Sequence, residues 1–166
     1  MRSLVSTATL IVLAGATPID AQTLITHRLP AMLALEAAVE AVTVCSQRGY
    51  AVAATVIDID ARRVAMLRGD GAGVHTEDVS WGKAYAAVSY APIYGYTSSG
   101  AAAARPQPPS APAFQPPEHM VLRGGGLTIK LGDEVIGAIG VSGSPGAEND
   151  EACARAGLSK IQDRIR

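Results

Sequence analysis

The sequence predicts an α+β fold, in which a single antiparallel sheet is flanked by helices. Segments with helical periodicity alternate with short β-rich runs in the order helix, two strands, helix, several strands, helix. The length of 166 residues suits one domain with a core of its own. Aromatic residues make up only 4% of the chain, so we expect a core of Ala, Val, Leu and Ile with closely packed elements.

The first predicted helix covers residues 29–48. Small and apolar residues recur in it at helical spacing and form one stripe: Ala31, Ala34, Leu35, Ala38, Val42 and Cys45. Pro30 suits the first turn of this helix, and Gly49 suits its C-terminal end. Two β-rich runs follow at 51–57 and 63–68, and the short turn between them predicts a hairpin.

A second helix is predicted from Thr76 to about Tyr90. Thr76 is a favourable N-cap, and Glu77 and Asp78 in the first turn complement the helix dipole. A flexible loop with three glycines, residues 69–73, precedes it. One face of this helix carries Val79, Lys83, Ala86 and Tyr90.

Residues 92–117 differ from the rest of the chain because they hold most of its prolines. They predict a long irregular insertion, and loops of this length are usually functional or disordered. Tyr94, Tyr96 and Phe114 lie within it. These aromatic residues either form a lid over a pocket or anchor the loop to the surface, and the sequence favours neither.

Three further strands are predicted at 120–123, 127–131 and 135–141, followed by a last helix from Glu148 or Asn149. Its apolar stripe is Ala154, Leu158, Ile161 and Ile165. The glycine triplet Gly124, Gly125 and Gly126 indicates a turn with close backbone approach. It does not match a dinucleotide fingerprint, because no strand-to-helix pattern surrounds it.

The N-terminus has the layout of a secretory signal peptide, predicted at 1–21. Arg2 is followed by an uncharged run that is too short to span a bilayer, and a small-residue cleavage site precedes Gln22. The alternative is an N-terminal helix that stays attached. We therefore expect a mature domain at 22–166, periplasmic or secreted, with no integral membrane segment. The net charge of −1 disfavours nucleic acid as a partner.

Cys45 and Cys153 are the only cysteines. An oxidising compartment would permit a bridge between them, but two buried thiols fit the sequence nearly as well.

Several short motifs occur in a fixed order along the chain. They are Val56-Ile57-Asp58, Arg68-Gly69-Asp70-Gly71-Ala72, Gly82-Lys83-Ala84-Tyr85-Ala86-Ala87, Gly124-Gly125-Gly126, Gly137-Ala138-Ile139-Gly140-Val141-Ser142-Gly143 and Asp150-Glu151-Ala152-Cys153-Ala154-Arg155-Ala156-Gly157. This series resembles the GlcG/HbpS-like haem-binding family, which includes the C-terminal domain of PduO-type proteins. The resemblance implies a profilin-like or PAS-like sheet, a haem cofactor and a homo-oligomer. Two departures, the proline-rich insertion and Leu127-Thr128 after the triplet, fall where a ligand would bind.

The candidate binding residues surround the expected pocket. His75 precedes the second helix and is a candidate axial ligand of haem iron, with a solvated histidine as the alternative. His119 is a second candidate, and Glu77 could join His75 in an iron site. Lys83 could pair either with a haem propionate or with Asp58. The full set of predicted ligand-binding residues is His75, Lys83, Tyr94, Tyr96, His119, Arg123, Gly124, Gly125 and Gly126.

Three functions remain open at this stage. The first is an exported protein that binds haem or another small molecule, in haem handling or sensing. The second is a small enzyme for an organic acid or redox substrate, with His75 as acid/base and Lys83 as the carboxylate anchor. The third is an assembly module without a ligand.

Overall fold

The computed structural model describes residues 23–106 and 114–166. The predicted signal peptide and the middle of the proline-rich insertion lie outside these residues. The helices are α1 (Ala31–Gln47), α2 (His75–Tyr85), α3 (Ser99–Ala103) and α4 (Ala147–Ile161), with short helical turns η1 (Ala86–Tyr90), η2 (Ala91–Tyr94) and η3 (Gln162–Arg164). The strands are β1 (Ala53–Asp58), β2 (Arg63–Arg68), β3 (Gly126–Leu131) and β4 (Glu134–Ser142).

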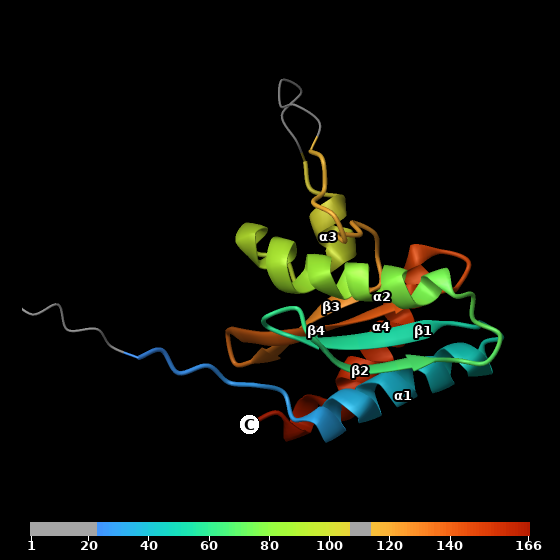
Figure 1. Ribbon diagram of the computed structural model, residues 1–166, viewed down its shortest axis with the longest axis horizontal. Coiled ribbons are helices and arrows are strands. Elements are labelled where there is room, and N and C mark those ends of the chain that lie inside the picture. Colours follow the sequence, from blue (N-terminus) through green and yellow to red (C-terminus); the bar gives the residue numbers. More distant parts are fainter. Residues whose placement is uncertain (1–22, 107–113) are drawn as a thin grey trace, which may run out of the picture.

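The four strands form one antiparallel sheet in the order β2-β1-β4-β3. Helices α1 and α4 cover one face of this sheet, and α2 with the turns that follow it covers the other (Figure 1). The predicted α+β fold with a single antiparallel sheet is therefore confirmed. Among the described residues, no helix combines the length and hydrophobicity needed to cross a bilayer.

The larger core lies between the sheet and the α1–α4 layer. Because side chains alternate along a strand, Val56, Ile139 and Val141 face this layer, while their neighbours face α2. Cys45 of α1 and Cys153 of α4 are fully buried here and form a disulfide, with their Cα atoms 5.7 Å apart. Of the two alternatives for the cysteines, a disulfide or two buried thiols, the structure therefore contains the disulfide.

The other face of the sheet is built from small residues, and α2 lies close against it. Gly126 of β3 pairs with Gly140 of β4 directly beneath this helix. A Cβ added to Gly140 would lie 2.0 Å from the Ser80 carbonyl oxygen, and one added to Gly126 would lie 2.1 Å from the Lys83 carbonyl oxygen. The predicted close approach at the glycine triplet is thus an approach of α2 to the sheet.

Several element boundaries differ from the predictions. Residues 120–123 form no strand, because the Val121 amide donates to the Gly82 carbonyl of α2 and not to a neighbouring strand. Thr76 is not the N-cap: α2 begins at His75, and the Thr76 hydroxyl donates back to the Gly73 carbonyl. The helix predicted to reach Tyr90 continues from α2 as a π-helical turn.

The proline-rich insertion is partly ordered. Its described residues include η2 and α3, which rest on a cluster formed by Tyr90, Ala91 and Ala102. The Phe114 ring stacks on Tyr90 with centroids 4.8 Å apart. These contacts anchor both ends of the insertion to the α2 layer.

Candidate functional site

Two neighbouring hollows open along α2, and Val79 lines both of them. Their volumes are about 430 Å³ and about 470 Å³, within the range of small-molecule sites. The first, here called the basic cleft, is lined by His75, Val79, Lys83, Arg123, Ser142, Gly143, Ser144, Gly146, Ala147 and Asp150. The second, here called the aromatic hollow, is lined by Arg63, Asp78, Val79, Trp81, His119 and Val121.

The basic cleft brings together three residues that the sequence singled out. His75 is the first residue of α2 and is exposed, and its imidazole folds over Gly73, where a Cβ would lie 2.8 Å from the ring. Arg123 is exposed, while its backbone carbonyl accepts a hydrogen bond of 2.5 Å from Ser99. Lys83 lines the same cleft but is only 3% exposed.

Lys83 is bound inside the protein. Its Nζ donates to Asp150 Oδ2 at 2.6 Å and to the Val141 carbonyl at 3.1 Å. The other carboxylate oxygen, Asp150 Oδ1, accepts from the backbone amide and the hydroxyl of Ser144. The predicted alternative of a pair with Asp58 is wrong, because Asp58 binds Arg28 and the backbone of its own turn.

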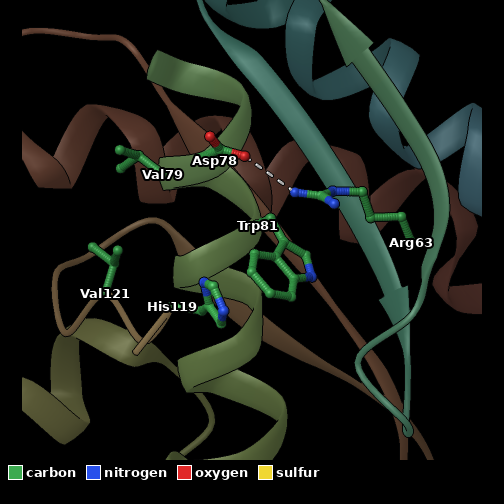
Figure 2. Close-up of a pocket in the computed structure, with 6 residues that line it drawn as sticks. All are labelled: Arg63, Asp78, Val79, Trp81, His119 and Val121. Atoms are coloured by element: carbon green, nitrogen blue, oxygen red, sulfur yellow. Dashed lines mark hydrogen bonds and ion pairs between the residues drawn. The ribbon is translucent and has the colours of Figure 1, made fainter. Parts of the chain in front are cut away.

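The aromatic hollow is built around the chain's single tryptophan. Figure 2 shows Arg63 reaching from β2 towards Asp78, with the Trp81 indole between β2 and the His119 imidazole. The Arg63 guanidinium lies 4.6 Å from the Trp81 ring centroid, and the His119 ring lies 5.1 Å from it. The Trp81 Nε1 donates to the Ala61 carbonyl, which fixes the indole in place.

Gly82 explains why His119 lies on α2. A Cβ at this position would lie 2.6 Å from the His119 carbonyl oxygen and from the Val121 side chain. The absence of a side chain therefore lets residues 119–121 pack directly against the helix. His119 has a φ of 74°, a value that non-glycine residues rarely adopt, and this turn places its imidazole beside Trp81.

Glu77 and the two predicted lid tyrosines lie outside both hollows. Glu77 pairs with Arg68, and the described residues contain no group of three or more His, Cys, Asp or Glu suited to a metal ion. Tyr94 stacks under Arg105, and the neighbouring Tyr90 raises the pKa of the Tyr94 hydroxyl above its ordinary value. Tyr96 packs against the same cluster. These contacts fit the interpretation in which the aromatic residues anchor the insertion to the surface, and not the one in which they form a lid over a pocket.

The glycine triplet lies beside Lys83 and not in the cleft lining. A Cβ on Gly125 would lie 3.0 Å from Lys83 Nζ, and Gly124 faces the start of α4 at Ala147. The triplet therefore leaves the space in which the Lys83 side chain packs.

Sequence reasoning missed Asp150, Trp81 and Arg63. Asp150 had a usable signal, because it precedes the buried Cys153 by three residues and therefore shares its inward face of α4. Trp81 is the only tryptophan in the chain. Arg63 had no signal, since its position opposite Trp81 depends on how α2 crosses the sheet.

The fold defines a small α+β protein with two neighbouring hollows along one helix. The family model for HbpS-like proteins, described as haem degrading protein HbpS-like, matches residues 29–159. The chain belongs to this family. A comparison with curated proteins gave no match.

Three solved structures illustrate the relationship. A double mutant of HbpS from Streptomyces reticuli is 29% identical, with a TM-score of 0.73, over 87% of this chain and 97% of that one. The protein ORFY of Klebsiella pneumoniae is 24% identical, with a TM-score of 0.64, over 89% and 98% of the two chains. A complex of PduOC with heme is 20% identical, with a TM-score of 0.67, over 81% and 96%. The last two relationships show the shared fold.

Proposed function

We propose that the protein binds haem on the α2 surface, with the porphyrin in the aromatic hollow and His119 as the ligand of the iron. The family's description as haem degrading and the haem complex of the PduOC structure support a haem ligand. The observation that carries the site is the exposed His119 imidazole lying against the Trp81 indole.

The residues of the aromatic hollow fit a haem group. Trp81, Val79 and Val121 offer a flat apolar wall, and an imidazole is a common axial ligand of haem iron. Arg63 is 46% exposed and could bind a propionate if its pair with Asp78 opens. Bound haem would supply the redox chemistry of its iron, while these side chains bind and orient the ring.

The basic cleft fits a porphyrin less well. Its lining is dominated by serine, glycine and charged groups, and Lys83 is already paired with Asp150. His75, which lines the basic cleft, nevertheless remains the iron ligand that the sequence predicted, and the histidine variants below test it against His119.

A hemin titration with three histidine variants tests the proposal. We expect a Soret band with the unaltered protein, a loss of the band in His119→Ala, and an unchanged band in His27→Ala. His27 is a matched control because it lines neither hollow. It binds Glu134 at the start of β4 and lowers the pKa of that carboxyl.

The possible outcomes show whether His119 or His75 is the ligand of the iron. Loss of the band in His75→Ala alone would move the iron ligand to the basic cleft and favour the sequence-based prediction. The absence of a Soret band with unaltered protein, or a band unchanged in both variants, would contradict the proposal.

Export to the periplasm or medium is a further part of the proposed function. A disulfide in a protein of this size is typical of an oxidising compartment, which supports it. Mass spectrometry of the protein recovered from a periplasmic or culture fraction would test it, with an N-terminus at Gln22 as the expected result.

Self-association also remains a prediction. The outer face of α1 supports it, because Met32, Leu35 and Val39 recur there at helical spacing and are 66%, 41% and 43% exposed.

A further inference from the structure

The basic cleft has a charge that its own residues do not balance. Asp150 is the only carboxylate that lines it, and both of its oxygens are occupied by Lys83 and Ser144. The charges of Lys83 and Asp150 therefore cancel, and the positive charge of Arg123 remains. Within residues 23–106 and 114–166, the ion pairs of arginine involve Arg28, Arg63, Arg68, Arg155 and Arg164, and none involves Arg123.

Ser142 provides a second and independent observation. It is the last residue of β4, it lines the cleft, and it is only 6% exposed. Strand alternation places its side chain on the α2 face, together with Ala138 and Gly140. Among the described residues its hydroxyl has no hydrogen-bond partner, and the oxygen is not fully buried, so it is reached from the cleft. This donor is available to a ligand in the cleft.

Two further features at the cleft favour a negatively charged ligand. His75 lies at its edge and can donate a hydrogen bond. Helix α4 begins there, and its N-cap Gly146 supplies no side chain to the first-turn amides. The positive end of a helix dipole favours an anion. Glu148 does not line the cleft, but its carboxylate lies over Gly146, where a Cβ would be 2.3 Å from Oε1, so it takes up part of this dipole and Arg123 is the main attraction for an anion.

From these contacts we propose that the basic cleft binds a small oxyanion, namely the carboxylate of a small organic acid or a phosphate group. The Arg123 guanidinium can form two parallel hydrogen bonds to either group. The Ser142 hydroxyl, which lines the same cleft, would donate to the same anion. The ligand is compact, because the lining offers few apolar side chains apart from Val79 and Ala147.

This site is separate from the proposed haem site. The aromatic residues Trp81 and His119 do not line the basic cleft, and Arg123 and Ser142 do not line the aromatic hollow. The two proposals can therefore fail independently.

Isothermal titration calorimetry of the protein with succinate, and separately with inorganic phosphate, tests the inference. We expect saturable binding of at least one probe that weakens as salt is added. Because a hydrogen bond to a charged group is worth more than one between neutral groups, Arg123→Ala should lower the affinity roughly tenfold or more, and Ser142→Ala roughly fivefold. Preference for one probe identifies the anion as carboxylate or phosphate.

Arg48→Ala is the matched control, since Arg48 is an exposed arginine at the end of α1 and lines neither hollow. It should leave binding of the probe unchanged. The inference is overturned if neither probe binds saturably, or if Arg123→Ala and Ser142→Ala bind as tightly as the control. A Trp81→Ala variant that loses the hemin band but keeps the anion would confirm that the sites are distinct.

Discussion

Lys83 shows how a single residue can be placed correctly and still be given the wrong task. The sequence left two partners open for this lone lysine, a ligand carboxylate or Asp58. The structure puts it in the expected cleft but joins it to Asp150 at 2.6 Å, with side-chain exposures of 3% and 5%. The pair links α2 to α4, and the bond to Val141 adds the end of β4. The partner lies 67 residues further along the chain, beyond the reach of local sequence patterns.

Breaking this ion pair from one side should destabilise the protein strongly. Lys83→Met keeps most of the side-chain volume but leaves the Asp150 carboxylate buried without its cation, for which a loss of about 3–5 kcal/mol is expected. Urea denaturation followed by circular dichroism would measure it. The double variant Lys83→Met with Asp150→Asn should recover part of the loss, because it removes the uncompensated charge. A loss below about 1 kcal/mol in the single variant would contradict a structural role for the pair.

At the scale of elements, the most specific packing is that of α2 on β3 and β4. This helix has no strong apolar stripe; its buried residues include Thr76, Ser80 and Lys83. It is held by close backbone approach over Gly126 and Gly140 and by the 2.7 Å hydrogen bond between Thr55 and Ser80. Both hollows open along this helix, so its distance from the sheet sets their shape.

Gly140→Ala should therefore disturb the site as well as the fold. The added Cβ meets backbone atoms, 2.0 Å from the Ser80 oxygen and 2.7 Å from the Ala84 nitrogen, which cannot move aside as a flexible side chain would. A loss of stability of about 3 kcal/mol is expected, at the upper end for overpacking, together with weaker hemin binding.

Gly132→Ala is the matched control for this substitution. Gly132 lies in the turn before β4 with a φ of 59°, and no atom lies within 4 Å of its added Cβ. It should lose only about 1 kcal/mol, the cost of a left-handed conformation. Equal losses in the two variants, measured by thermal or urea denaturation, would show that the approach of α2 is not tight.

The sequence predicted the elements with strong periodicity and missed those set by tertiary contacts. Residues 63–68 form β2 exactly as expected, and the helix predicted at 29–48 is α1 with slightly shorter ends. The strand predicted at 120–123 failed because Gly82 lets this segment bond to α2. The cleft around His75, Lys83 and Arg123 was foreseen in part, while the aromatic hollow depends on how β2, α2 and residues 119–121 meet.

For the whole molecule, the contacts that join α1 to α4 lie apart from the aromatic hollow, but α4 also contributes to the basic cleft. The Cys45–Cys153 disulfide joins the two helices inside the larger core. The ion pair Lys160–Glu40 adds a link between the same helices, and Arg164 of the following turn η3 pairs with Glu36 of α1. The aromatic hollow lies on the opposite side of the sheet, where α2 packs, whereas the basic cleft lies between α2 and the start of α4 and is lined in part by Ala147 and Asp150.

Removing the disulfide should lower stability without abolishing hemin binding. The cysteines are 108 residues apart, and closing a loop of this length in the unfolded chain is worth about 4–5 kcal/mol in the entropic model. The double variant Cys45→Ala, Cys153→Ala should lose about that much in urea denaturation, and the unaltered protein with added reductant should lose a similar amount. Because the bridge lies across the sheet from Trp81, the folded variant should still bind hemin. A stably folded variant that does not bind hemin would show that the α1–α4 layer also sets the geometry of the aromatic hollow.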